Sequence, residues 1–149
     1  MIIFMKKILP IVIIIVLFSQ GISKPIGIRD LHLKADGLYY SSYKDTPFTG
    51  IVSGPYKEMI HHYNKNTLVR RNIEGKIIDG KREGIWTTYS EMGNLKLRLH
   101  YKNGNLEFSE DYHDNGNLKT RGYYINSEPA GFWESFDEDG KLIDYAEFH

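Results

Sequence analysis

The chain has 149 residues, carries 19 basic and 19 acidic side chains, and contains no cysteine. The length fits one domain, and the neutral charge excludes a polybasic nucleic-acid binder. Without cysteine, a disulfide framework, a thiol nucleophile and a cysteine-linked lipid anchor are all excluded.

The N-terminus has the order of a secretory signal. Two lysines precede an apolar run over residues 8–18, and small residues follow at Gly21 and Ser23. Because this run is short and interrupted by Pro10, it does not span a bilayer comfortably. We therefore expect residues 1–23 to be a signal peptide that is cleaved after Ser23, and the mature protein to be exported to the periplasm, the cell envelope or the medium. The alternative is an uncleaved membrane anchor.

The next segments have weak strand patterns. Residues 24–35 are expected to form an irregular lead-in, because Pro25 and Gly27 interrupt any periodicity. An extra loop is expected around residues 53–55. Short strands are predicted at residues 38–40, 47–52, 58–63 and 68–73. These first units are degenerate, as terminal repeats often are when they cap an array.

A tighter repeat begins at Gly84. Three Gly-Asn-Leu tripeptides each open a run that closes on tyrosine six residues after the leucine, and Gly-Lys-Leu opens a fourth run that ends on Phe148. An even offset places the leucine and the aromatic residue on the same side of a β-strand. The pattern therefore predicts strands with one apolar face. The first three runs are Leu95 to Tyr101, Leu106 to Tyr112 and Leu118 to Tyr124.

The turns between these runs predict the register. Asn103-Gly104 fits a two-residue type I′ turn, which places Tyr101 opposite Leu106. Residues 114–116 fit a three-residue loop with glycine in the left-handed position, and residues 91–93 and 138–140 have the same form. Pro129 lacks an N–H group and is expected in a loop between strands.

A shift of 47 residues aligns Gly84-Ile85-Trp86 with Gly131-Phe132-Trp133, and Tyr101 with Phe148. This is about two repeats of 23–24 residues. The predicted fold is all-β, with consecutive antiparallel β-hairpins in a twisted meander over residues 36–149.

These residues carry a family resemblance. Asp-Gly-Leu-Tyr-Tyr at 36–40, Pro-Phe-Thr-Gly at 47–50, and Gly-x-Trp-x-x-Tyr followed by x-x-Gly-x-Leu resemble the MORN-variant repeat family. Many of its bacterial members are labelled YwqK-family antitoxins. The resemblance implies hairpins in a meandering sheet, with no catalytic activity and no cofactor. Together with the export signal, it leads us to expect an exported antitoxin-like or immunity-like protein.

The face opposite the leucine and tyrosine set is the candidate binding face. The predicted register places Trp86 opposite Arg98, with Arg98, Ser109 and Arg121 in one row. Trp, Tyr and Arg are enriched at interface hot spots. We therefore predict a partner-binding face, and the alternative is a solvated face of cross-strand charge pairs. The predicted residues are Trp86, Arg98, Arg121, Tyr123, Trp133 and Tyr145.

Residue types that carry chemistry are scattered. His61 and His62 are adjacent and point to opposite faces of a strand, which is poor geometry for one metal. Residues 137–140 begin like a calcium loop but lack its distal Glu ligand, so a β-turn is expected. Glu134 and Asp144 are expected opposite each other on the apolar face, without a third catalytic group. We therefore predict no enzyme activity, no cofactor and no metal.

The predicted function is a non-enzymatic interaction module that acts on an unknown protein partner and does not bind nucleic acid. The alternative is a cell-envelope scaffold whose aromatic and basic face contacts lipid headgroups or glycan.

We expect the mature protein to begin at Lys24. N-terminal sequencing of protein recovered from the cell envelope or the medium measures this directly. Protein that keeps Met1 and stays in the cytosol would contradict both the cleavage site and the predicted location.

Overall fold

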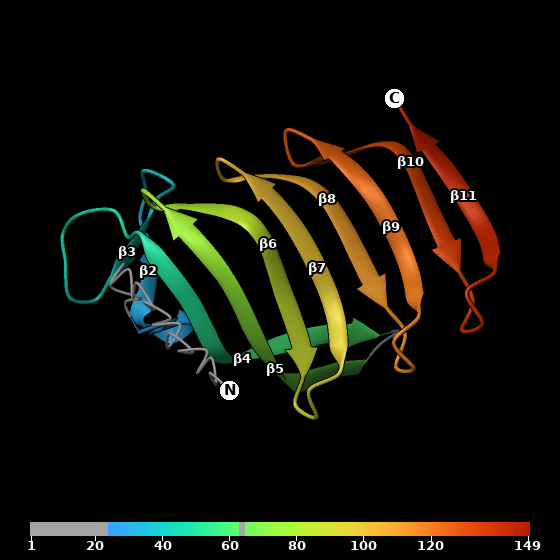
Figure 1. Cartoon of the computed structure of the whole chain (residues 1–149), viewed down its shortest axis with the longest axis horizontal. Helices are drawn as coiled ribbons and strands as arrows, with labels where there is room; N and C mark the ends of the chain where they lie inside the picture. The colour runs from blue at the N-terminus through green and yellow to red at the C-terminus, as the bar shows by residue number, and fades with distance from the viewer. Residues whose placement is uncertain (1–23, 63–64) are drawn as a thin grey trace, which may run out of the picture.

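The computed structural model describes residues 24–62 and 65–149. Apart from one short 3-10 turn, η1 (Ile28–Asp30), the regular elements of these residues are all β-strands, which confirms the predicted class (Figure 1). No helix of this described part is long and apolar enough to cross a membrane. The strands are β1 (Ile26–Gly27), β2 (Leu31–Leu33), β3 (Tyr39–Ser41), β4 (Gly50–His62), β5 (Lys65–Ile78), β6 (Lys81–Ser90), β7 (Leu95–Lys102), β8 (Asn105–Tyr112), β9 (Leu118–Ile125), β10 (Glu128–Phe136) and β11 (Leu142–Phe148).

The main sheet is a meander. It contains nine strands in the order β1-β4-β5-β6-β7-β8-β9-β10-β11, and every neighbouring pair from β4 onward is antiparallel. The short β1 adds to β4 in parallel, while β2 and β3 form a separate two-stranded sheet. Sequential hairpins thus account for the whole architecture from β4 to the C-terminus.

The two kinds of turn are confirmed. Asn103 and Gly104 have φ angles of 50° and 86°, as a type I′ turn requires. In the three-residue loops the glycine N–H donates back to the carbonyl oxygen three residues earlier, at 3.0 Å for both Gly93 to Ser90 and Gly116 to His113. The two-residue turns lie at one end of the strands and the three-residue loops at the other end.

A β-bulge follows each repeat leucine. The predicted pairing of aromatic residue with leucine is confirmed, for example Tyr89 with Leu95 and Tyr101 with Leu106. Beyond each such pair the leucine strand carries one extra residue, which shifts every later pair by one position. The extra residues are Lys96, Glu107, Lys119 and Ile143.

This shift corrects the predicted faces. Trp86 pairs with Leu99, and Arg98 pairs with Thr87, so the predicted opposition of Trp86 and Arg98 is wrong. Directly paired residues share a face, and faces alternate along a strand. We call the side that carries Trp86, Leu97 and Leu99 the Trp face, and the other side the ladder face.

Both tryptophans pack on a glycine of the preceding strand. A Cβ on Gly75 would overlap the indole of Trp86, and a Cβ on Gly122 would overlap that of Trp133. The Trp86 Nε1–H donates to the carbonyl oxygen of Lys76, and that of Trp133 to Tyr123, both at 3.1 Å. This unit therefore recurs after 47 residues, glycine partner included.

The Gly-x-Trp tripeptide makes this packing possible. Gly84 and Gly131 have φ angles of 68° and 63°, which glycine adopts without steric cost. The pairing with the preceding strand is interrupted at both tripeptides. The local bend brings the tryptophan, which stands two residues after this glycine, over the backbone of the preceding strand.

The core lies at the N-terminal end of the Trp face. Leu31, Val52, Ile77 and Trp86 are buried together, and Ile26 and Ile28 pack against them. Residues 24–35, predicted to be an irregular lead-in, thus contain β1, η1 and β2 and supply the buried Leu31. These residues are ordered because burying their apolar side chains in the cluster that contains Trp86 is favourable.

Two predicted loops are strands. Residues 53–55 continue β4, paired without interruption to β5, and Pro129 lies inside β10, paired with Tyr124. Pairing with β11 begins only at Gly131, so Pro129 lies where β10 has one neighbour and its missing N–H is tolerated. The far half of the β4–β5 hairpin bends behind β6 and β7 (Figure 1), where Arg70 and Glu91 lie 3.3 Å apart.

Gly75→Ala is expected to destabilise the protein by about 1–3 kcal/mol, because the new methyl group overlaps the Trp86 indole in a packed core. Chemical denaturation measures the change in unfolding free energy. Glu74→Ala, one residue earlier and exposed, is the control and should leave stability nearly unchanged. Equal stability of both variants would contradict the packing of Trp86 on Gly75.

Candidate functional site

A row of alternating charges crosses the ladder face. The paired residues Arg98, Glu110, Arg121 and Glu134 come from the four consecutive strands β7 to β10, and Tyr145 of β11 follows Glu134. Opposite charges in directly paired positions stabilise a sheet, whereas like charges would repel. The bulges thus align four charges of alternating sign, which we call the charge ladder.

The ladder side chains are held by polar and aromatic contacts. The Arg121 Nε–H donates to Glu134 at 2.5 Å, and its guanidinium lies 5.5 Å from the Phe136 ring centre. The hydrogen bond to Glu134 raises the pKa of Arg121 above its usual value. Arg98 donates to the Tyr112 hydroxyl at 3.3 Å. Each arginine is therefore oriented while its side chain remains at the surface.

The pKa of the Tyr112 hydroxyl is raised, as expected for a partly buried group beside an acid. Partial burial raises its pKa, the Glu110 charge raises it further, and Arg98 opposes the rise. Tyr112 therefore stays neutral and acts as a hydrogen-bond acceptor for Arg98. This arrangement orients an arginine and does not activate a nucleophile.

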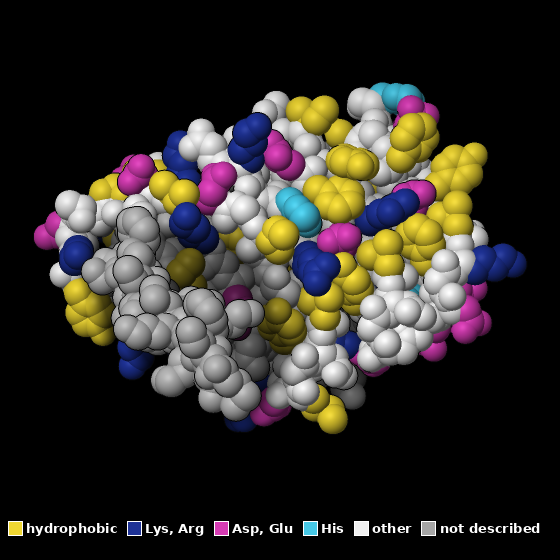
Figure 2. Space-filling model, viewed as in Figure 1, with side chains coloured by type: hydrophobic (Ala, Val, Ile, Leu, Met, Phe, Trp, Pro, Cys, Tyr) yellow, Lys and Arg dark blue, Asp and Glu magenta, His cyan; other side chains and the backbone are white. Residues whose placement is uncertain are grey.

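An aromatic row runs beside the charge ladder. The rings of His100 and Phe108 are 5.4 Å apart, and those of Phe108 and Tyr123 are 4.8 Å apart. Tyr123, Phe132 and Tyr145 are exposed at 57%, 54% and 68%. The space-filling view shows hydrophobic side chains interspersed with basic and acidic ones over β7 to β11 (Figure 2). The ladder face thus presents aromatic and charged groups together.

The predicted site residues divide between the two faces. Arg98, Arg121, Tyr123 and Tyr145 lie on the ladder face and are exposed. Trp86 does not belong with them, because it is 2% exposed and forms part of the core. Trp133 and Ser109 also lie on the Trp face, since both pair with Gly122. The predicted cleavage position, Ser23, lies outside the described residues.

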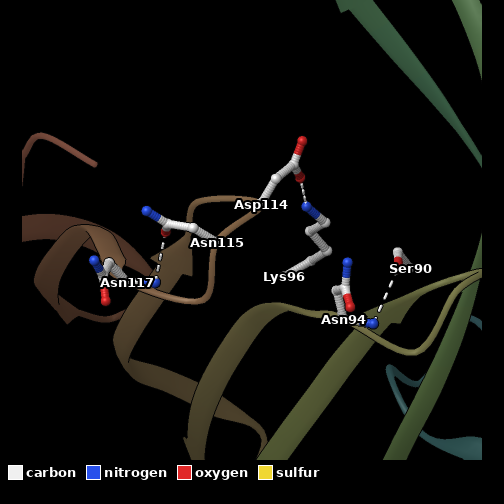
Figure 3. A network of polar contacts seen from close by, with 6 residues as sticks. All are labelled: Ser90, Asn94, Lys96, Asp114, Asn115 and Asn117. Atoms are coloured by element: carbon white, nitrogen blue, oxygen red, sulfur yellow. Dashed lines mark hydrogen bonds and ion pairs between the residues drawn. The ribbon is translucent and has the colours of Figure 1, made fainter. Parts of the chain in front are cut away.

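The three-residue loops form a separate polar edge. Lys96 of β7 contacts Asp114 in the β8–β9 loop, and the backbone N–H of Asn117 donates to Asn115 Oδ1 at 2.9 Å (Figure 3). Partial burial lowers the pKa of Lys96, and the charges of Arg71 and Lys119 lower it further. The first of the four bulge residues thus joins two neighbouring turns.

A groove of about 550 Å³ lies beside this edge. Its walls include the cations Arg71, Lys96 and Lys119, and acids balance them at Asp111, Asp114 and Glu138. His113, at the end of β8 beside the turn, has its Nε2 atom 2.9 Å from the carbonyl oxygen of Phe136. The charges inside the groove are matched. Its polar side chains make contacts at the turns, such as Lys96 with Asp114 and His113 with the Phe136 carbonyl oxygen.

The candidates for catalysis and metal binding do not assemble. Glu134 pairs with Tyr145 and Asp144 with Ser135, so the two carboxylates lie on opposite faces and their predicted opposition is wrong. Asp137 accepts the backbone N–H groups of Asp139 and Lys141 at 3.1 and 2.8 Å, as a turn residue does. Within residues 24–62 and 65–149, no group of three potential metal ligands was found.

Sequence reasoning missed half of the ladder face. Glu110 was not recognised as a ladder member, and Glu134 was assigned to the apolar face. The cause is the bulge, whose extra residue is lysine, glutamate or isoleucine and carries no common signal. The recurrence of glycine at positions 75 and 122, in step with the two tryptophans, is the signal that could have assigned Trp86 and Trp133 to the core side.

Comparison with known proteins supports the repeat assignment. The MORN repeat variant family matches the chain at two repeats, over residues 82–103 and 109–126. These stretches cover the β6–β7 hairpin and most of the β8–β9 hairpin. No curated protein and no solved structure gives a significant match. MORN repeats are generally binding and interaction modules and are typically non-catalytic.

Replacing Arg121 and Glu134 by alanine, singly and together, should reveal a coupling of about 0.2–1 kcal/mol, as partly exposed ion pairs give. Urea denaturation of the four proteins measures it. The coupling should shrink at 1 M salt because the pair is screened. A coupling of several kcal/mol would show that the charge ladder is part of the core, contrary to its exposure.

Proposed function

We propose that the protein is an exported, non-enzymatic binding module that acts by protein–protein contact through its ladder face. The observation that carries the proposal is the exposed aromatic row beside the charge ladder. In this proposal Arg98, Arg121, Tyr123 and Tyr145 contact the partner, together with Phe132. Capture of a partner in a fixed ratio is the action expected of an antitoxin-like or immunity-like protein.

The composition of the ladder face supports a protein partner. Tyrosine and arginine contribute disproportionately to interface energy, and exposed rings gain from leaving water. Three aromatic side chains here are more than half exposed: Tyr123 and Phe132 lie on strands paired on both sides, and Tyr145 lies on the edge strand β11. Around Tyr123, the pairing of β9 with both neighbouring strands limits the conformational freedom lost on binding, which favours affinity.

The charge ladder adds specificity. Two arginines alternate with two glutamates, so a partner with the reverse alternation pairs in one register and meets like charges when shifted by one position. An anionic membrane surface attracts an excess of basic residues, which this balanced row lacks. The ladder face therefore fits a folded protein better than a lipid headgroup layer.

The test uses the mature protein to capture its partner from the envelope fraction of its own cells, followed by affinity measurement with the purified partner. Tyr123→Ser combined with Tyr145→Ser should weaken binding at least about thirtyfold, since hot-spot side chains contribute 2 kcal/mol or more. The melting temperature should stay nearly unchanged, because both side chains are exposed.

The matched control combines Tyr43→Ser with Met92→Ser, two residues that are 77% and 89% exposed and lie in loops outside the ladder face. The control should bind at full strength. A Tyr123 and Tyr145 double variant that also binds at full strength would overturn the ladder face as the contact surface. Salt-sensitive binding to anionic vesicles, without a protein partner, would favour the lipid-contacting scaffold instead.

A further inference from the structure

The first tryptophan unit holds a cation of its own. The Arg82 guanidinium lies 5.5, 4.8 and 5.2 Å from the ring centres of Tyr39, Trp86 and Tyr101. It donates to the hydroxyl oxygens of Tyr101 and Tyr39 at 2.8 and 3.1 Å. Three rings thus surround one guanidinium, and we call Tyr39, Trp86 and Tyr101 the first ring site.

The second tryptophan unit repeats the ring geometry. Trp133 and Phe148 stand 47 residues after Trp86 and Tyr101. Their ring centres are 6.0 Å apart at 69°, compared with 6.5 Å and 77° in the first unit. Tyr124 adds a third ring, 5.1 Å from Trp133 at 71°. These three aromatic residues on the Trp face form the second ring site.

The second ring site differs in its cation. Pro129 occupies the position that corresponds to Arg82. Among residues 24–62 and 65–149, no lysine or arginine was found over the rings of Tyr124, Trp133 or Phe148. Trp133 is half-buried and Phe148 is 44% exposed, whereas Trp86, which corresponds to Trp133, is only 2% exposed. The Trp133–Phe148 pair is therefore arranged as the Trp86–Tyr101 pair is, whereas the third ring, Tyr124, stands at the position of Ile77. The second ring site is partly accessible to another molecule.

The charge around the second ring site favours a cation. Residues 128–149, which form the β10–β11 hairpin and the C-terminus, contain seven acidic residues and one lysine. Residues 24–127 contain 16 basic and 12 acidic residues, so the negative charge is concentrated at this end. A cation near the rings gains from the negative face of each ring and from the net negative charge of this end of the sheet.

We propose that the second ring site binds an arginine side chain presented by a protein partner, as the first ring site binds Arg82. The inference rests on the proposed function in assuming a protein partner, and it adds a separate contact on the Trp face, opposite to the ladder face. Guanidinium is the fitting cation because it is planar and weakly hydrated and stacks on aromatic rings. Phe148 lacks the hydroxyl of Tyr101, so contact with the three rings provides the recognition.

The experiment titrates the purified mature protein with N-acetyl-arginine amide and follows both indole N–H signals by NMR. The Trp133 signal, assigned by its loss in Trp133→Phe, should shift and saturate. The Trp86 signal should stay in place because Arg82 already fills the first ring site. N-acetyl-citrulline amide, the uncharged analogue, should bind at least about threefold more weakly.

Equal shifts with citrulline would overturn the cation requirement, and equal shifts of both indoles would show non-specific contact. Absence of a Trp133 shift would overturn the site itself. None of these results depends on partner capture by the ladder face, so this inference and the proposed function can fail separately.

A second variant supplies the cation within the chain. Pro129→Arg should fill the second ring site as Arg82 fills the first, which should abolish the Trp133 response to the arginine probe. Pro129→Gln, a long uncharged side chain at the same position, is the control and should leave the response in place. Equal responses of the two variants would overturn the correspondence between the two ring sites.

Discussion

The β-bulge after each repeat leucine determines which side chains share a face of the sheet. One extra residue per hairpin leaves the aromatic–leucine pair intact and shifts all later pairs by one position. Without it, Trp86 would stand beside Arg98, and the alternation of Arg98, Glu110, Arg121 and Glu134 would not form. Both the buried tryptophan and the exposed charge ladder therefore depend on the same backbone irregularity, repeated at four places.

The packing of tryptophan on glycine occurs twice, once in each half of the molecule, and the two copies have different surroundings. In the first half, Leu31 and the residues of β1 and η1 cover the tryptophan, and Arg82 closes the aromatic cluster with its guanidinium. In the second half the same glycine, tryptophan and aromatic positions recur, but Pro129 replaces the arginine and the rings stay accessible. A duplicated unit thus serves stability at one end and remains available for recognition at the other.

Turn chemistry and periodicity were sufficient to predict β7, β8, β9 and β11, the loop types between the repeat strands and the first pair of each repeat hairpin, because each depends on residues close in sequence. The faces beyond that pair were predicted wrongly for Trp86, Ser109 and Glu134, because a bulge residue can be lysine, glutamate or isoleucine and leaves no local pattern. The cover provided by Leu31 was missed for a different reason: its partners Val52, Ile77 and Trp86 are distant in sequence. Exposed aromatic residues such as Tyr123 and Tyr145 were recognised by residue type, which the register error did not affect.

From β6 onward the sheet is one layer in which each strand packs mainly against its neighbours. Such a chain behaves as a nearly one-dimensional array, in which stability is a sum of local terms and neighbouring interfaces. The buried cluster at the N-terminal end therefore lends little rigidity to β10 and β11, several strands away. Local opening is least costly at the end with the fewest buried contacts. Binding at that end would add apolar cover of the kind that Leu31, β1 and η1 provide for the first tryptophan.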